Sequence, residues 1–399
     1  MLEGLDRLPT DPILGLMAAF RSDPSPRKID LGVGVYRDER GDTPVLDAVR
    51  AAESRMLAAQ LSKTYVAPAG NAGFNSAMEK LVFGDSHPLL GSGRLHTIQS
   101  VGGCGALRLG AELIRIARGE TTIHVSDPTW ANHVPLLSGA RLKLERYPYY
   151  DPETGGVRFE AMSAALNGLA PGSIVLLHAA CHNPTGADLS VAQWDALLEV
   201  FKRRSLVPFL DMAYQGLGDG VAQDALSVRR FAEELPEVLV AVSCSKNFGL
   251  YRERTGALHI VTDTPTAGDA VLSQLVRSAR TLYSMPPDHG AAIVHTILAT
   301  PQLRAEWEKE VSIMRARIAG LRREAEDRLA RLCPQRDFSF IKRQKGMFSF
   351  LGLTVQQVHA LREGFHVYMT DDSRINIAGL RSENLDDFVR AVAGVLSRS

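Results

Sequence analysis

The order of apolar and polar positions divides the 399-residue chain into alternating strand-like and helix-like segments. Short apolar or alternating runs predict strands at residues 95–101, 121–126, 141–147, 173–178, 206–210, 238–242 and 256–261. Helical spacing or propensity predicts helices at residues 45–61, 73–83, 106–117, 191–204 and 227–235. Because continuously apolar strands with helical crossovers are covered on both faces, the pattern predicts an α/β fold with a mainly parallel sheet.

The two ends of the chain have different sequence patterns. Residues 1 to about 30 are short-patterned and rich in proline, beginning with Pro9, and we expect an arm that packs on another surface such as a second subunit. Residues 29–36 predict a strand that passes into a glycine loop. From Leu303 to Leu332 apolar residues recur every three or four positions, which predicts one long amphipathic helix.

These sequence patterns predict that the chain has three parts. Residues 1–44 form the arm and part of a small domain, residues 45–300 form the large domain, and residues 301–399 form an interdomain helix with a smaller α+β C-terminal domain.

Composition excludes several classes of function. The chain has 45 Lys plus Arg and 45 Asp plus Glu, so its net charge is zero and no nucleic-acid partner is expected. The apolar runs are too short for a membrane span, and the N-terminus lacks a signal or transit pattern, so we expect a cytoplasmic protein. The four cysteines are far apart without a C-x-x-C pair, and we expect reduced thiols and no metal.

Chemically capable residues follow four of the predicted strands. Trp130 and His133 follow 121–126, Asn183 follows 173–178, and Asp211 follows 206–210. The fourth strand, 238–242, leads into a lysine segment. Because function gathers at the carboxyl ends of parallel strands, we expect one shared pocket.

The lysine segment contains the sharpest chemical signal. Lys246 lies among small hydroxylated residues, with Arg254 close by, and desolvation plus like charge would lower the pKa of its amine. Such an amine forms a Schiff base with an aldehyde, while Ser243 and Arg254 suit a phosphate. The turn 102–105 before a predicted helix also suits an anion. A Schiff-base lysine with phosphate-binding groups matches pyridoxal phosphate (PLP), although a solvated lysine and an ordinary glycine turn explain each segment alone.

Four motifs carry a family resemblance. They are Ser-x-Ser-Lys-Asn-Phe-Gly at 243–249, His-Asn-Pro-Thr-Gly at 182–186, Asp-x-Ala-Tyr-Gln-Gly at 211–216 and Ser-Arg-Ile-Asn at 373–376. Along nearly its whole length the chain resembles the fold-type I, PLP-dependent class I aminotransferases of the aspartate and aromatic amino acid branch. The resemblance implies a seven-stranded, mainly parallel sheet covered by helices, a smaller α+β domain, an N-terminal arm and a homodimer.

The resemblance also implies roles for individual residues. Lys246 would form the Schiff base and move a proton, Asp211 would pair with the pyridine nitrogen, and Tyr214 would hydrogen-bond the phenolic oxygen. The cofactor-binding set it implies is Tyr65 of the neighbouring subunit, Gly102, Gly103, Cys104, Trp130, His133, Asn183, Asp211, Tyr214, Ser243, Ser245, Lys246 and Arg254. The substrate-binding set is Gly34, Trp130, Asn183, Arg374 and, from the neighbour, Arg280.

Substrate choice depends on finer differences. Arg280 matches the arginine that binds the distal carboxylate of aspartate and glutamate. Aspartate-dedicated members have polar residues where this chain has Thr64, Cys104 and Met285, whereas Val35 and Thr43 match the aspartate pattern. The resemblance therefore favours an aromatic amino acid aminotransferase that uses 2-oxoglutarate. Aspartate aminotransferase is the alternative, followed by a PLP β-lyase or decarboxylase, a non-catalytic PLP-binding protein and a nicotinamide dehydrogenase.

Overall fold

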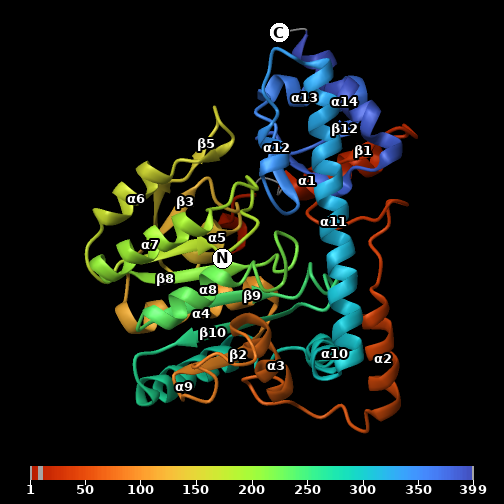
Figure 1. Ribbon diagram of the computed structural model, residues 1–399. Coiled ribbons are helices and arrows are strands. Elements are labelled where there is room, and N and C mark those ends of the chain that lie inside the picture. Colours follow the sequence, from red (N-terminus) through yellow and green to blue (C-terminus); the bar gives the residue numbers. More distant parts are fainter. Residues whose placement is uncertain (1, 8–11, 398–399) are drawn as a thin grey trace. The chain divides into compact units, whose positions relative to one another are not determined.

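The computed structural model describes residues 2–7 and 12–397, and part of the predicted arm, including Pro9, lies outside the described residues. The chain divides into two compact units. The larger unit comprises residues 43–316 and 344–346, and the smaller unit comprises residues 1–42, 317–343 and 347–399. Each unit is described separately below (Figure 1).

A seven-stranded sheet forms the centre of the larger unit. Its strand order is β2-β10-β9-β8-β7-β3-β4. Only β10 runs antiparallel to its neighbours within this sheet, and the other pairs are parallel. The strands are β2 (Leu95–Val101), β3 (Thr122–Asp127), β4 (Lys143–Pro148), β7 (Ile174–His178), β8 (Val207–Met212), β9 (Val238–Ser243) and β10 (Thr255–Val261). The predicted mainly parallel seven-stranded sheet is confirmed.

Helices cover this sheet in two groups. In one group α4 (Gly102–Arg118) packs on β9 and β10 and contacts α5 (His133–Ser138) and α9 (Pro265–Leu282). In the other group α6 (Phe159–Asn167) contacts α7 (Val191–Arg204), α7 contacts α8 (Leu226–Glu234), and α8 contacts α3 (Ala72–Phe83). Every residue of β7, β8, β9 and β10 is buried, as the apolar runs require.

Local signals in the sequence explain several helix boundaries. Ser190 and Gln193 form a capping box at the start of α7, and Asn71 caps α3 by accepting the N–H of Phe74. Pro265 occupies the first turn of α9, where no intrahelical N–H bond is lost. The unit also contains α2 (Asp47–Ala59), α10 (Asp288–Ala299) and the two-stranded pair β5 (Tyr150–Asp151) and β6 (Gly156–Val157).

The long helix α11 (Pro301–Leu332) agrees with the predicted amphipathic helix and contributes residues to both units. The smaller unit further contains α12 (Phe340–Arg343), α13 (Val355–Phe365) and α14 (Ser382–Leu396). Its strands form two pairs, β1 (Ile29–Asp30) with β12 (Val367–Tyr368) and β11 (Phe348–Phe350) with β13 (Arg374–Asn376). The short 3-10 helices η1 (Leu2–Gly4) and η2 (Ile377–Gly379) complete it.

One expectation for the N-terminal region needs correction. Residues Pro12–Ser22 form α1, where only a proline-rich arm is predicted, because a proline at the first helical position is compatible with a helix. Residues 29–36 agree with the predicted strand that passes into a glycine loop. The strand β1 ends at Asp30, and in the loop that follows the carbonyls of Gly32, Val33 and Val35 accept side-chain hydrogen bonds.

Within residues 2–7 and 12–397, no helix has both the length and the apolar character that crossing a bilayer requires.

Candidate active site

One cavity in the larger unit gathers side chains from the carboxyl ends of β3, β7, β8 and β9 and from the start of α4. Its volume is about 160 Å³. Ten predicted site residues line it: Gly103, Cys104, Trp130, Asn183, Asp211, Tyr214, Ser243, Ser245, Lys246 and Arg254. Leu107, His178 and Ala213 complete the wall.

Lys246 follows β9 by three residues and is half-buried beside the cavity. Its Nζ lies 4.9 Å from the centre of the Tyr214 ring. Burial lowers the pKa of the Lys246 ammonium, and the positive charge of Arg254 lowers it further, although Asp211 acts in the opposite direction. A larger fraction of this amine is therefore neutral than is usual for lysine, as a nucleophile requires.

The backbone next to Lys246 is anchored to α11. Nε1 of Trp307 donates a hydrogen bond of 2.8 Å to the carbonyl of Asn247. The Trp307 indole also stacks on Phe248, with ring centroids 4.5 Å apart and an interplanar angle of 8°. Both aromatic residues are completely buried, so these contacts fix the turn that carries the lysine.

Asp211 lies near the end of β8, beside His178 of β7 in the strand register. Nε2 of His133 lies 3.0 Å from Oδ2 of Asp211, and Nδ1 of His133 lies 2.7 Å from Oγ1 of Thr129. Burial by itself would raise the pKa of the Asp211 carboxyl, but the hydrogen bond with His133 and the Lys246 ammonium lower it below its ordinary value. Asp211 is therefore an anion at neutral pH.

His178 is a wall residue that the sequence prediction missed. It is buried, and neither of its ring nitrogens has a hydrogen-bond partner among the described residues. Burial, with a smaller contribution from His133, lowers its pKa to about 3, so the ring is neutral. Nothing in the sequence around His178 distinguishes it from a core histidine. Its pairing with Asp211 becomes visible only once the strand register is known.

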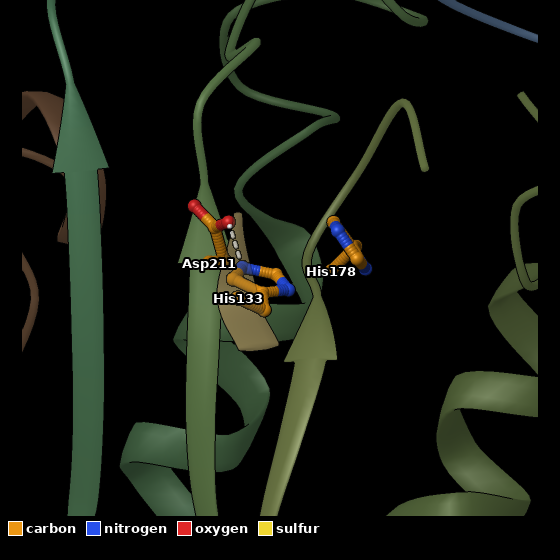
Figure 2. A group of neighbouring side chains, drawn as sticks. All are labelled: His133, His178 and Asp211. Carbon is orange, nitrogen blue, oxygen red and sulfur yellow. Dashed lines mark hydrogen bonds and ion pairs between the residues drawn. The ribbon is translucent and has the colours of Figure 1, made fainter. Parts of the chain in front are cut away.

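His133, His178 and Asp211 could in principle hold a metal ion, since one ligand atom from each lies within 4.8 Å of the others (Figure 2). However, both nitrogens of His133 already face hydrogen-bond partners, Thr129 and Asp211. This arrangement is typical of a histidine that orients a carboxylate. The absence of a metal stays a prediction.

An anion-binding corner lies where β2 leads into α4. Gly102 begins α4 with φ +66°, and a Cβ there would lie 2.5 Å from Nη2 of Arg254. Nη1 of Arg254 donates to Oγ of Ser245 at 3.4 Å, and the N–H of Ser245 donates to Oγ of Ser243 at 3.2 Å. Gly102 does not line the cavity itself; its missing side chain leaves room for the guanidinium. The helix N-terminus and the arginine both favour an anion at this corner.

Asn183, Tyr214 and Trp130 form another part of the wall. Nδ2 of Asn183 donates to the hydroxyl of Tyr214 at 3.4 Å. The Trp130 indole packs edge-on against His133, with ring centroids 5.3 Å apart and an interplanar angle of 81°. His133 itself is completely buried and does not line the cavity, because it lies behind Asp211.

Two further predicted residues belong to the smaller unit. Arg374 lies on β13, and its Nη2 donates to the carbonyl of Gly32 at 2.8 Å. Its guanidinium lies 4.5 Å from the centre of the Phe348 ring. Gly34 packs on the same ring, since a Cβ at Gly34 would lie 2.8 Å from Cζ of Phe348. Arg374 and Gly34 therefore belong to one small cluster.

The two residues predicted to act across a dimer are exposed in the single chain. Tyr65 is 87% exposed in the loop after α2. Arg280 is exposed in the last turn of α9, where its Nη1 donates to Oγ of Ser284 at 2.9 Å. Neither residue lines the cavity of its own chain.

The fold and this lysine–carboxylate cavity agree with a known class of protein. The family model for aminotransferase class I and II matches residues 26–392. The chain belongs to this family.

Individual relatives are similar over their full length. The aromatic-amino-acid aminotransferase of Paracoccus denitrificans is 45% identical over 400 residues, which span 99% of this chain and all of the relative. The aspartate aminotransferase of Pseudomonas aeruginosa is also 45% identical, over 396 residues, with the same coverage. A solved structure of an aromatic-amino-acid aminotransferase from Burkholderia pseudomallei, covalently bound to pyridoxal phosphate, superposes with a TM-score of 0.97 at 48% identity, covering 99% of both chains.

Proposed function

We propose that this protein is a PLP-dependent aromatic amino acid aminotransferase that moves the amino group of phenylalanine, tyrosine or tryptophan to 2-oxoglutarate. One observation carries the proposal. A lysine with a lowered pKa and an ionised aspartate line the same cavity, whose third side is an anion-binding corner. The aromatic-amino-acid aminotransferases among its relatives support the choice of substrate.

The residues around the cavity fit PLP. A cavity of about 160 Å³ is large enough for one aromatic ring, since one of about 150 Å³ accommodates benzene. Lys246 would bind the aldehyde carbon, and Asp211 would accept a hydrogen bond from the pyridine nitrogen. Arg254, Ser243, Ser245 and the amides of Gly103 and Cys104 would bind the phosphate at the start of α4. Asn183 and Tyr214 would bind the phenolic oxygen, and Trp130 would lie against the ring.

When bound, PLP supplies an electron sink that acidifies the α-proton of an amino acid. Nζ of Lys246 would take this proton, because its lowered pKa favours the neutral amine. Asp211 holds negative charge where the pyridine nitrogen would lie, and His133 fixes the orientation of that carboxylate. Trp307 keeps the lysine turn in place through the carbonyl of Asn247.

Arg374 and Arg280 would bind the carboxylates of the substrates. A guanidinium matches the two oxygens of the α-carboxylate, and Arg374, with the Gly34 backbone, would hold it. Arg280 from the neighbouring subunit would bind the distal carboxylate of 2-oxoglutarate. Cys104 lines the cavity, whereas Thr64 and Met285 do not, and the departures from the aspartate-dedicated pattern at these three positions would make the substrate site more tolerant of a ring.

We propose that the active unit is a homodimer. Leu57, Leu61 and Tyr65 are 84%, 98% and 87% exposed on α2 and the loop after it, and a second copy would bury this apolar surface. Tyr65 would then reach the phosphate of the partner's cofactor. We also propose a cytoplasmic location, which the lack of a disulfide bond among the four cysteines supports.

The chemistry is tested on Lys246. The purified protein is expected to be yellow, and borohydride reduction is expected to fix the cofactor on the peptide that contains Lys246. Lys246→Ala should lower kcat by about 10²–10⁴-fold or more, because both the covalent bond and the proton carrier are lost. Transamination by Lys246→Ala at the wild-type rate would rule out this mechanism.

The substrate is tested by comparing kcat/KM for phenylalanine, tyrosine, tryptophan and aspartate. We expect at least one aromatic donor to be used as well as aspartate or better. A large preference for aspartate over all three would favour the alternative, aspartate aminotransferase, and would leave the chemistry at Lys246 unchanged. Release of ammonia or carbon dioxide in place of amino transfer would indicate a lyase or decarboxylase.

A further inference from the structure

In the smaller unit, β13 holds the loop of residues 31–35 through two side chains on the same face. Arg374 donates from Nη2 to the carbonyl of Gly32 at 2.8 Å. Asn376 donates from Nδ2 to the carbonyls of Val33 and Val35, both at 2.7 Å. Alternate residues of a strand point the same way, so Arg374 and Asn376 reach the loop together. The two carbonyls that flank Gly34 are therefore tied to the strand that carries Arg374.

The amide of Asn376 is matched to this task. Asn376 is 1% exposed, and its Oδ1 accepts the N–H of Ala378 at 3.0 Å. Its backbone N–H donates to the carbonyl of Leu31 at 2.7 Å. The side chain thus needs one acceptor and two donors, and an amide is the group of this size that supplies them. Aspartate offers no donor when ionised, and an apolar residue offers neither group.

The ring of Phe348 lies against both Gly34 and Arg374. Its ring contacts the position of Gly34 and lies under the Arg374 guanidinium, and in the β11–β13 register Phe348 is opposite Asn376. Buried Arg322 also holds the backbone of Phe348, because its Nη2 donates to the carbonyl of Phe348 at 2.6 Å. The loop, the ring and the arginine are therefore fixed against one another within the smaller unit.

We propose that Asn376 is a positioning residue for the substrate α-carboxylate. It fixes the loop of residues 31–35 relative to Arg374, so that the Gly34 backbone and the Arg374 guanidinium bind the carboxylate together. This inference rests on the proposed function, in which Arg374 and the Gly34 backbone bind that carboxylate. Asn376 itself does not touch the substrate. Its effect is transmitted through the carbonyls of Val33 and Val35.

The test uses the PLP-loaded enzyme and the variants Asn376→Ala and Asn376→Asp, the second of which keeps the volume of the side chain. The probe is 3-phenylpropionate, which has the ring and carboxylate of phenylalanine but no amine. Its Kd, measured by calorimetry, should rise about tenfold or more in both variants, since the half-buried carbonyls of Val33 and Val35 lose the donor that Asn376 supplies and the loop can shift. KM for phenylalanine should rise by a similar factor with kcat nearly unchanged, because ground-state and transition-state binding are lost equally.

A second substrate separates positioning from a general loss of structure. 2-Phenylethylamine has the same ring and amine but no carboxylate, and its single-turnover rate, followed by cofactor absorbance, should stay within about twofold of wild type if only carboxylate binding changes. Asn384→Ala is the matched control. It removes another asparagine hydrogen bond of the smaller unit, the one from the N–H of Arg381 at 2.8 Å, and should leave the Kd for 3-phenylpropionate unchanged.

Three outcomes would overturn the inference or its basis. A Kd within about twofold of wild type in both Asn376 variants would show that Asn376 does not position the receptor, as would an equal loss with 2-phenylethylamine. A wild-type enzyme that neither binds 3-phenylpropionate nor reacts with phenylalanine would instead refute the proposed function. The two failures are thereby distinguishable.

Discussion

Nε2 of His133 lies 3.0 Å from Oδ2 of Asp211, and both groups are buried at the back of the cavity. Thr129 bonds the other nitrogen of the same ring, so the imidazole is held from both sides. A carboxylate oriented in this way keeps its charge in a place where burial alone would raise its pKa. The proposed pairing of Asp211 with the cofactor nitrogen depends on that charge.

Asp211→Asn should therefore lower kcat for phenylalanine by about 10²–10³-fold, because an amide of the same size cannot supply the negative charge. For a second variant, His133→Phe, we expect a smaller effect. It removes one hydrogen bond to the charged carboxylate and should lower kcat for phenylalanine by about 10- to 100-fold. Steady-state assays with saturating PLP measure both effects. If Asp211→Asn has the smaller effect, the pairing proposed for Asp211 is wrong.

The part of the site that the sequence predicts is the part with a local chemical signal. Lys246, Asp211 and Asn183 each follow an apolar strand, and the parallel order of the strands brings them together. His178 has no such signal, since its role follows from its register beside Asp211. Leu107 and Ala213 were also missed, because an apolar wall residue looks like any core residue.

The secondary structure, like the site, could be predicted where the sequence carries a local signal. The strands of the main sheet agree with the predicted segments to within two residues at each end, and β7, β8, β9 and β10 are completely buried, as their apolar runs predict. Helix α1 was missed because Pro12 and the prolines that follow suggest an irregular arm, although proline is well suited to a first turn. The domain boundaries at residues 44 and 300 stay a prediction, as do the roles of Tyr65 and Arg280, which require a second copy of the chain.

Arg280→Ala should change the choice of substrate more than the chemistry. If Arg280 binds the distal carboxylate, kcat/KM for aspartate and for 2-oxoglutarate should fall by about 10- to 100-fold, the range expected for a lost hydrogen bond to a charged group. The half-reaction with phenylalanine, which lacks that carboxylate, should change by less than about threefold. Arg277→Ala, one turn earlier on the same helix, is the matched control. Equal losses for aspartate and phenylalanine would contradict this role.

Shared active sites can be tested with hybrid dimers. Lys246→Ala and Arg280→Ala are each expected to be inactive or weak with aspartate, since each homodimer has two defective sites. If Arg280 acts across the interface, a hybrid has one site with both groups intact, and equal co-expression should restore about a quarter of wild-type activity. Differently tagged chains and two-step purification would isolate the hybrid, where the expected value is about half. A hybrid no more active than the two parents would place Arg280 in its own chain's site.

Buried neutral histidines should make the fold sensitive to acid. Burial lowers the pKa of His259 to about 3, whereas an ordinary histidine has a value of 6.5. The folded protein therefore binds fewer protons than the unfolded chain below pH 6.5. The destabilising effect is absent above that pH and grows as the pH falls towards 3, by about 1.4 kcal/mol per pH unit.

His259→Gln, which can keep a bond to Oγ1 of Thr97, 2.7 Å from Nδ1 in the wild type, should remove this contribution. Urea unfolding between pH 7 and 5 should show a flatter pH dependence for His259→Gln than for the wild type. Parallel curves for wild type and His259→Gln would mean that His259 is charged, or accessible to water, in the folded state.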